Sequence, residues 1–202
     1  MFARLVTEDQ RLLRRAVLIV VMLNILYFGV EFAVALAIGS VSLFADSADF
    51  LEDTAVNLLV LLGLTWSMRN RARLGMCLAL ILLVPGLATL WTAWERLNQP
   101  LAPNPLPLSL AGTGALLVNI TCALILARVR HHSGSLTKAA FLSARNDAAA
   151  NVTIIAAGLV SAFVWRSSWP DLLVGLGIAA MNSDAAKEIW KAARDEHRGA
   201  RA

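Results

Sequence analysis

The sequence contains few of the residues and motifs that mark soluble enzymes and disulfide-bonded secreted proteins. It has only two cysteines, Cys77 and Cys122, and they lie in apolar segments without CxxC spacing. They are therefore expected to be small buried residues that form neither a disulfide framework nor a metal site. No P-loop, GxGxxG, HExxH or GxSxG motif occurs, so nothing indicates a nucleotide-binding enzyme, a zinc protease or a serine hydrolase.

Hydrophobic residues, by contrast, are abundant. They make up 58% of the 202 residues and raise the mean hydropathy to +0.65, which is too apolar for a soluble domain of this length. About twenty apolar residues cross a bilayer, and six segments meet or approach this length, over residues 16–38, 42–66, 74–94, 106–127, 136–165 and 170–190. We therefore expect an all-α membrane protein, a six-transmembrane-helix bundle. It would be a single transmembrane domain over residues 1–202 with no soluble C-terminal domain.

The basic residues predict the orientation of this bundle. They gather before the first segment, between the second and third, between the fourth and fifth, and after the sixth, at Arg4, Arg11, Arg14, Arg15, Arg69, Arg71, Arg73, Arg128, Arg130, Lys138, Lys187, Lys191, Arg194, Arg198 and Arg201. The opposite connections carry only Arg96 and Arg166. The positive-inside rule then puts both termini in the cytoplasm, in a multi-pass protein of a bacterial inner (plasma) membrane. The pI near 9.7 reflects this topology, and no nucleic-acid partner is expected.

The second segment carries acidic residues at a depth where charge is costly. A carboxylate in hydrocarbon costs about 3 kcal/mol even on a lenient insertion scale. Asp46, Asp49 and Asp53 follow i, i+3, i+7 spacing, so they fall on one helical face, whereas Glu52 points about 100° away from Asp53. Several carboxylates on one face are expected where they line a wet cavity and hold a cation.

The fifth segment repeats this feature. Asp147 stands alone in an apolar stretch, with Asn151 one turn along. Two acidic positions on separate membrane helices predict a metal or proton site between those helices. Arg145 is expected to reach the cytoplasmic interface and not to neutralise a carboxylate of this site.

These acidic segments carry a resemblance to a known family. Residues 39–53, GSVSLFADSADFLED, look like the second-helix signature of cation diffusion facilitators, roughly G-S-x-(A/S)-L-x-A-D-(A/S)-x-(H/D)-x-x-x-D. Residues 140–147, AFLSARND, resemble the A-F-L-H-x-x-x-D of the fifth helix. Residues 169–171, WPD, are similar to the start of the sixth helix, and Asn24 and Glu31 fit the first. The resemblance covers nearly the whole chain, in order.

The resemblance implies an exporter of divalent metal ions, coupled to protons, working by alternating access. It gives Asp49, Asp53 and Asp147 as metal ligands. Ser143 stands where zinc transporters of the family carry histidine, so the site would be built from oxygen atoms. Such a site suits Mn²⁺ or Fe²⁺ better than Zn²⁺, with Co²⁺ and Cd²⁺ as further candidates, and Asn146 or Asn151 could add a carbonyl oxygen. The metal would be the transported substrate, and no prosthetic group is implied.

Other polar residues are assigned roles beside the metal site. Asp46 is expected to act in gating or the ion path more than as a ligand, with a helix-start charge as the alternative. Glu31 and Asn146 are placed in the ion path or gate, and for Glu31 a hydrogen bond within the bundle is an equal alternative. Asp171 is expected to cap the N-terminus of its own helix.

Two other function classes stay open. Asp46-x-x-Asp49 superficially resembles the first motif of CDP-alcohol phosphotransferases, but the Gly and Ala-Arg that should follow are absent. A membrane subunit with no transport of its own is the second alternative. Family members usually carry a cytoplasmic domain after the sixth span, which helps them to dimerise, whereas only residues 191–202 follow here. The chain is therefore expected to be a short form, for which a homodimer is possible but less strongly indicated.

Overall fold

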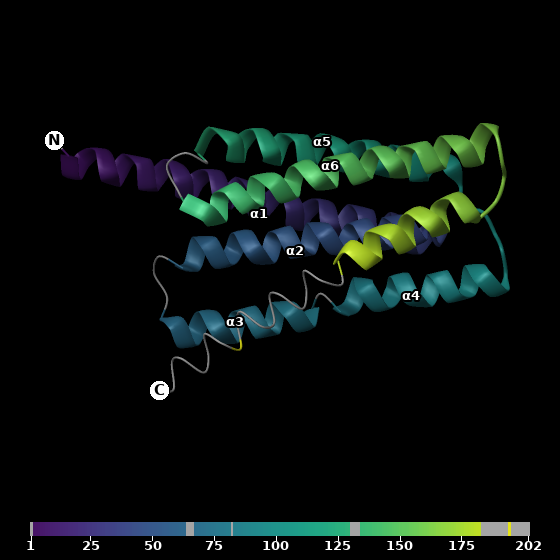
Figure 1. Ribbon diagram of the computed structural model, residues 1–202, viewed down its shortest axis with the longest axis horizontal. Helices are drawn as coiled ribbons and strands as arrows, with labels where there is room; N and C mark the ends of the chain where they lie inside the picture. Colours follow the sequence, from purple (N-terminus) through teal and green to yellow (C-terminus); the bar gives the residue numbers. More distant parts are fainter. Residues whose placement is uncertain (1, 64–66, 82, 130–133, 183–193, 195–202) are drawn as a thin grey trace.

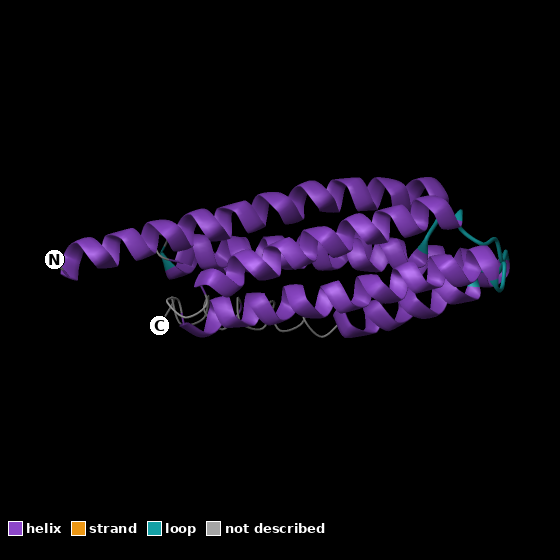
Figure 2. Cartoon of the chain, turned by 90° about the horizontal axis from the view of Figure 1, so that it is seen from above, coloured by secondary structure: helices purple, strands orange, loops and turns teal. Residues whose placement is uncertain are grey.

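The computed structural model describes residues 2–63, 67–81, 83–129, 134–182 and 194, and the regular elements in these ranges are helices (Figures 1 and 2). They are α1 (Phe2–Ile38), α2 (Val41–Gly63), α3 (Met68–Ile81), α4 (Leu83–Asn98), α5 (Pro105–Val129) and α6 (Gly134–Phe163). Residues 169–182 form a further helical segment. The described chain contains no strand, so the predicted all-α class is confirmed.

Successive long helices run in opposite directions along one common axis. α1 and α6 begin, and α2 ends, at the same end of the bundle, the left-hand end in Figure 1. Helices α1 and α2 are joined at the other end by Gly39 and Ser40. The turn requires a residue in the left-handed conformation, and Gly39 adopts it with φ of 60°. This conformation is energetically unfavourable for residues that have a side chain.

Three described helices are long and apolar enough to cross a bilayer: Arg11–Ile38, Pro105–Val129 and Ser143–Phe163. They correspond to the first, fourth and fifth predicted segments, and the chain is a membrane protein. Helix α2 has a suitable length but carries Asp46, Asp49, Glu52 and Asp53. The third predicted segment, residues 74–94, corresponds to α3 and α4. The sixth, residues 170–190, is helical as far as residue 182 and then leaves the described part of the chain.

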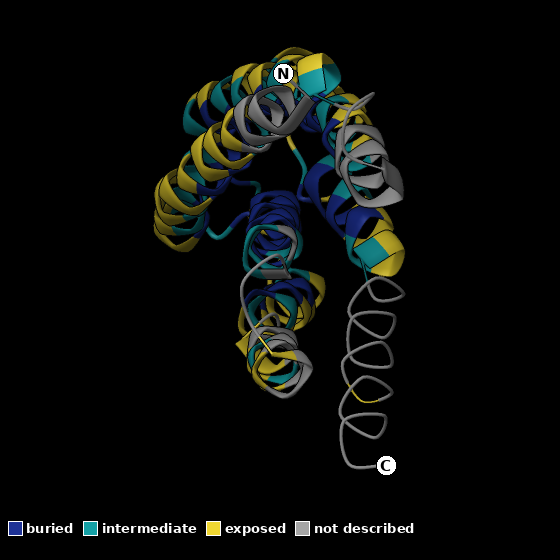
Figure 3. Cartoon of the chain, turned by 90° about the vertical axis from the view of Figure 1, so that its left-hand side faces the viewer, coloured by how far each residue is buried: buried dark blue, intermediate teal, exposed yellow. Residues whose placement is uncertain are grey.

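Helix α2 lies against the other helices over most of its length. Residues 40–51 are all buried, and α2 contacts α1, α4 and α6. Its Leu43 and Phe44 pack with Ala35 of α1, Leu108 of α5 and Ile154 of α6. Exposed residues lie mainly on the outer faces of the bundle and buried ones towards its middle (Figure 3). Large apolar side chains on those outer faces are expected where lipid is the solvent.

The start of α2 is held by a carboxylate from the far end of the chain. Asp171 accepts hydrogen bonds from the backbone N–H groups of Val41 (2.7 Å) and Ser42 (3.2 Å), and from the hydroxyls of Ser40 and Ser42 (2.6 Å each). The expectation that Asp171 caps its own helix is wrong, because its buried carboxylate caps α2. Arg96 of α4 donates to the carbonyls of Ile38 and Gly39 in the same turn. This turn therefore joins α1, α2, α4 and the 169–182 helix.

Candidate functional site

The acidic side chains of α2 divide between the interior and the periphery. Asp46, Asp49 and Asp53 are buried, whereas Glu52 is partly exposed. This distribution agrees with the i, i+3, i+7 spacing, which places the three aspartates on one helical face. Because α2 is packed on several sides, that face points into the helix bundle and not towards lipid.

Helix α6 brings a fourth carboxylate beside this face. Asp147 lies near enough to Asp49 and Asp53 for their charges to repel one another. The hydroxyl of Ser143, one turn earlier on α6, donates a hydrogen bond to Asp53 Oδ1 over 3.0 Å. It also lies within hydrogen-bonding reach of Asp147. Ser143 therefore lies between α2 and α6, in contact with an acid of each helix.

These side chains are neighbours without forming a finished coordination sphere. Within the described ranges, no three histidine, cysteine, aspartate or glutamate side chains converge closely enough to hold a metal ion. Mutual repulsion between uncompensated carboxylates opposes such convergence. A cation that bound here would have to draw Asp147 and the α2 aspartates together.

Asn151 belongs to a second set of contacts nearer the α1–α2 turn. Its side-chain nitrogen donates to Asp46 Oδ2 over 2.5 Å, and its side-chain oxygen accepts a hydrogen bond from Asn119 of α5 over 2.9 Å. Both polar atoms of the Asn151 amide are thus engaged. The sequence does little to mark Asn119, because an uncharged amide in a segment that also contains Ser109, Thr113 and Thr121 is a weaker signal than a carboxylate.

Glu31 of α1 is a second neighbour of Asp46, besides Asn151 of α6. Both residues are fully buried, and their carboxyl groups lie within hydrogen-bonding reach of each other. No N–H or hydroxyl group of the described chain reaches either oxygen of Glu31 or Oδ1 of Asp46. The adjacent Tyr27 uses its hydroxyl elsewhere, donating to the Ala111 carbonyl over 2.6 Å. Glu31, Asp46, Asn151 and Asn119 therefore connect α1, α2, α6 and α5 in the bundle interior.

The remaining candidate residues lie apart from these groups. Asn146 is exposed, and its side-chain oxygen accepts a hydrogen bond from Arg145 over 3.4 Å. Arg145 is exposed as well, which agrees with the prediction that it does not neutralise the acids. Asn24 is buried nearer the N-terminus of α1 than Glu31, and Cys122 donates a hydrogen bond to its side-chain oxygen over 3.6 Å.

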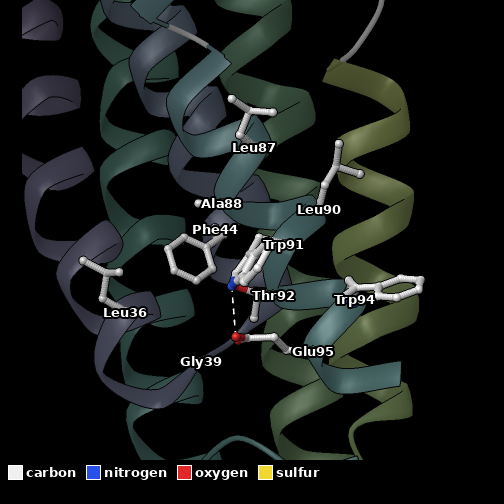
Figure 4. Close-up of a pocket in the computed structure, with 10 residues that line it drawn as sticks. All are labelled: Leu36, Gly39, Phe44, Leu87, Ala88, Leu90, Trp91, Thr92, Trp94 and Glu95. Atoms are coloured by element: carbon white, nitrogen blue, oxygen red, sulfur yellow. Dashed lines mark hydrogen bonds between the residues drawn. The ribbon is translucent and has the colours of Figure 1, made fainter. Parts of the chain in front are cut away.

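A hollow of about 920 Å³ lies at a different place, between α1, α2 and α4 (Figure 4). Its lining is mostly apolar and includes Leu36, Phe44 and Leu87. Its polar feature is the hydrogen bond from Trp91 Nε1 to Glu95 over 2.9 Å. None of the buried aspartates lines this hollow.

Comparison with known proteins gives one family. The model described as the cation efflux transmembrane domain matches residues 17–195. That range includes Glu31, Asp46, Asp49, Asp53 and Asp147. No curated protein matches the chain.

Proposed function

Because the chain belongs to the cation efflux family, we propose that it exports divalent metal ions in exchange for protons, by alternating access. The observation that carries the proposal is the set of three carboxylates, Asp49, Asp53 and Asp147, held on adjacent membrane helices with the Ser143 hydroxyl between them. Family membership favours transport over the phosphotransferase alternative. A carboxylate cluster in a membrane domain is also costly enough to require a functional reason.

The proposed ligands are Asp49, Asp53 and Asp147, with Ser143 as a neutral oxygen donor. Ser143 satisfies one oxygen of Asp53, and the three carboxylates repel one another. A divalent ion offsets that repulsion and would close α6 onto α2. Asn151 would join the ligands only by giving up its contact with Asn119, so its first role is to hold Asp46.

The donor atoms bear on the choice of metal. Carboxylate and hydroxyl oxygens are hard ligands, and the histidine nitrogen that suits Zn²⁺ is replaced by Ser143. We therefore rank Mn²⁺ and Fe²⁺ above Zn²⁺, Co²⁺ and Cd²⁺ as substrates. Metal binding requires ionised carboxylates, so protonation of the buried acids of the bundle opposes it. A more acidic exterior would release the ion there.

The first prediction is that Asp53→Asn and Asp147→Asn each abolish metal-dependent proton flux in proteoliposomes. Asparagine keeps the size and one oxygen of aspartate but cannot ionise, so it removes the charge that attracts the cation. Metal-free thermal stability in detergent should hold or rise, because a repelling charge is removed, while stabilisation by added metal is lost. Both properties are measured on the same preparations.

The matched control is Glu95→Gln, which neutralises an acid of the same bundle that lies outside the cluster. It should keep both proton flux and stabilisation by metal. Transport by Asp147→Asn but not by Asp53→Asn would contradict a site shared between α2 and α6. Full proton flux in both variants would show that these aspartates do not bind the transported metal. Absence of metal-dependent flux in the wild type would favour a protein that does not transport metal.

A further inference from the structure

The proposed metal ligands leave one buried acidic pair without a task. Glu31 of α1 and Asp46 of α2 are both fully buried, and their carboxyl groups lie within hydrogen-bonding reach of each other. Asp46 is one helical turn from Asp49, on the side of the α1–α2 turn. The charged neighbours that act on Glu31 are themselves acids, Asp46 and Asp49.

Two ionised carboxylates cannot form a hydrogen bond with each other, because both are acceptors. The unpartnered oxygens of Glu31 and Asp46 find no donor among the described residues, and buried polar groups without partners are rare. One proton between the two groups satisfies both at once and halves their charge. We propose that Glu31 and Asp46 share this proton and form the transporter's proton-binding site, separate from the three metal-binding aspartates.

The surrounding contacts assign the donor and the acceptor. Asn151 donates to Oδ2 of Asp46, which favours the charged form of Asp46, and Oδ1 of Asp46 has no other donor among the described residues. Asn119 fixes Asn151 in this orientation by donating to its oxygen. The hydroxyl of Tyr27 is engaged with Ala111 and cannot serve as the donor. The proton is therefore carried on Glu31 and donated to Asp46.

This position couples the proton to the metal through charge. Loss of the proton from Glu31 leaves a second negative charge on the pair, one turn from Asp49, which strengthens the attraction for a cation. Gain of a proton removes that charge and weakens metal binding. The two ions then oppose each other without sharing ligands, and such coupling is reciprocal. The inference rests on the proposed metal–proton exchange.

The test uses Glu31→Gln in proteoliposomes. Glutamine donates to Asp46 through its amide as a protonated glutamate does, but it never releases a proton. Exchange of metal for metal at equal pH on both sides should persist but require a higher metal concentration, because the neutral glutamine mimics the protonated glutamate. Metal movement driven by a pH gradient should be lost. Asp53→Asn, measured in parallel, should lose both activities.

Two outcomes would overturn the inference. One is Glu31→Gln protein that still moves metal in response to a pH gradient. The other is loss of metal-for-metal exchange and of stabilisation by metal, which would make Glu31 part of the metal site or of the fold.

An infrared measurement separates this inference from the proposed function. The wild-type protein should show the carbonyl stretch of a buried protonated carboxyl group, and Glu31→Gln should lack it. Absence of the band in the wild type overturns the shared proton whether or not metal is transported. A wild-type band without any metal transport contradicts the proposed function and leaves the shared proton in place.

Discussion

Single residues in this bundle differ most in whether their charge has a partner. Asp171 accepts four hydrogen bonds, and Asp53 accepts one from Ser143. The oxygens of Glu31 have no donor among the described residues. A fully satisfied carboxylate stabilises the fold, whereas an unsatisfied one is held by the rest of the structure at a cost. This difference separates structural acids from those proposed to bind ions.

Ser143 is the residue at which we expect a substitution to change metal preference. Ser143→His should place an imidazole nitrogen beside Asp53 and Asp147, and nitrogen donors favour Zn²⁺ over Mn²⁺. Competition between the two metals in proteoliposomes should therefore shift towards Zn²⁺. Ser143→Ala is the control, because it removes the hydroxyl without adding nitrogen and should not raise the preference for Zn²⁺. Unchanged relative uptake by the histidine variant would mean that position 143 does not face the ion.

At the scale of elements, the middle and the N-terminal end of α2 have different roles. Its middle presents Asp49 and Asp53 to α6, and its N-terminal end is tied by Asp171 and packed beside the Arg96-bound turn. A carboxylate at a helix N-terminus is favoured by the free N–H groups and by the helix dipole. These contacts fix the N-terminal end of α2 to the helix at residues 169–182.

We predict that Asp171→Asn destabilises the protein, although the same substitution at Asp147 should not. Asparagine cannot accept hydrogen bonds from all four donors at the α2 turn, and each buried group left unsatisfied costs about 1–3 kcal/mol. Thermal unfolding in detergent, without metal, compares the two variants directly. An Asp171→Asn protein as stable as the wild type would show that the capping contacts contribute little.

At the scale of the whole molecule, the bundle is arranged so that charge and apolar surface are separated. The outer faces expose large side chains such as Leu26, Leu36, Leu110 and Leu117, and the carboxylates lie between α1, α2 and α6. A soluble protein has the opposite arrangement, with charged groups outside and apolar groups inside. The arrangement found here suits a protein surrounded by lipid.

The orientation of the bundle in the membrane gives a further prediction. Basic residues cluster at the end where α1 and α6 begin, so that end should face the cytoplasm. A phosphatase reporter that folds to an active enzyme only outside the cytoplasm should be active when inserted after Leu101. It should be inactive when fused to the C-terminus. A fluorescent reporter that matures in the cytoplasm should give the reverse pattern. An active phosphatase at the C-terminus would contradict both cytoplasmic termini and an even number of spans.

Hydropathy and the cost of charge allowed much of this protein to be predicted from its residues alone. The membrane class, the positions of α1, α5 and α6, and the face shared by Asp46, Asp49 and Asp53 all follow from properties of short segments. Those properties do not depend on which helices become neighbours. The apolar run over residues 74–94 falls on α3 and α4, which the structure describes on either side of residue 82.

The choice of partners was decided only by the tertiary structure. Asp171 meets α2 across 130 residues of chain, and Asn151 meets Asp46 across 105. Such pairs depend on how each helix is rotated and how far it is shifted along its neighbour, and a single sequence does not encode these quantities in any local pattern. The cost of burying a charge belongs to the residue, so the sequence determines that Glu31 and Asp46 need partners. The packing of α1 against α2 determines that each is the partner of the other.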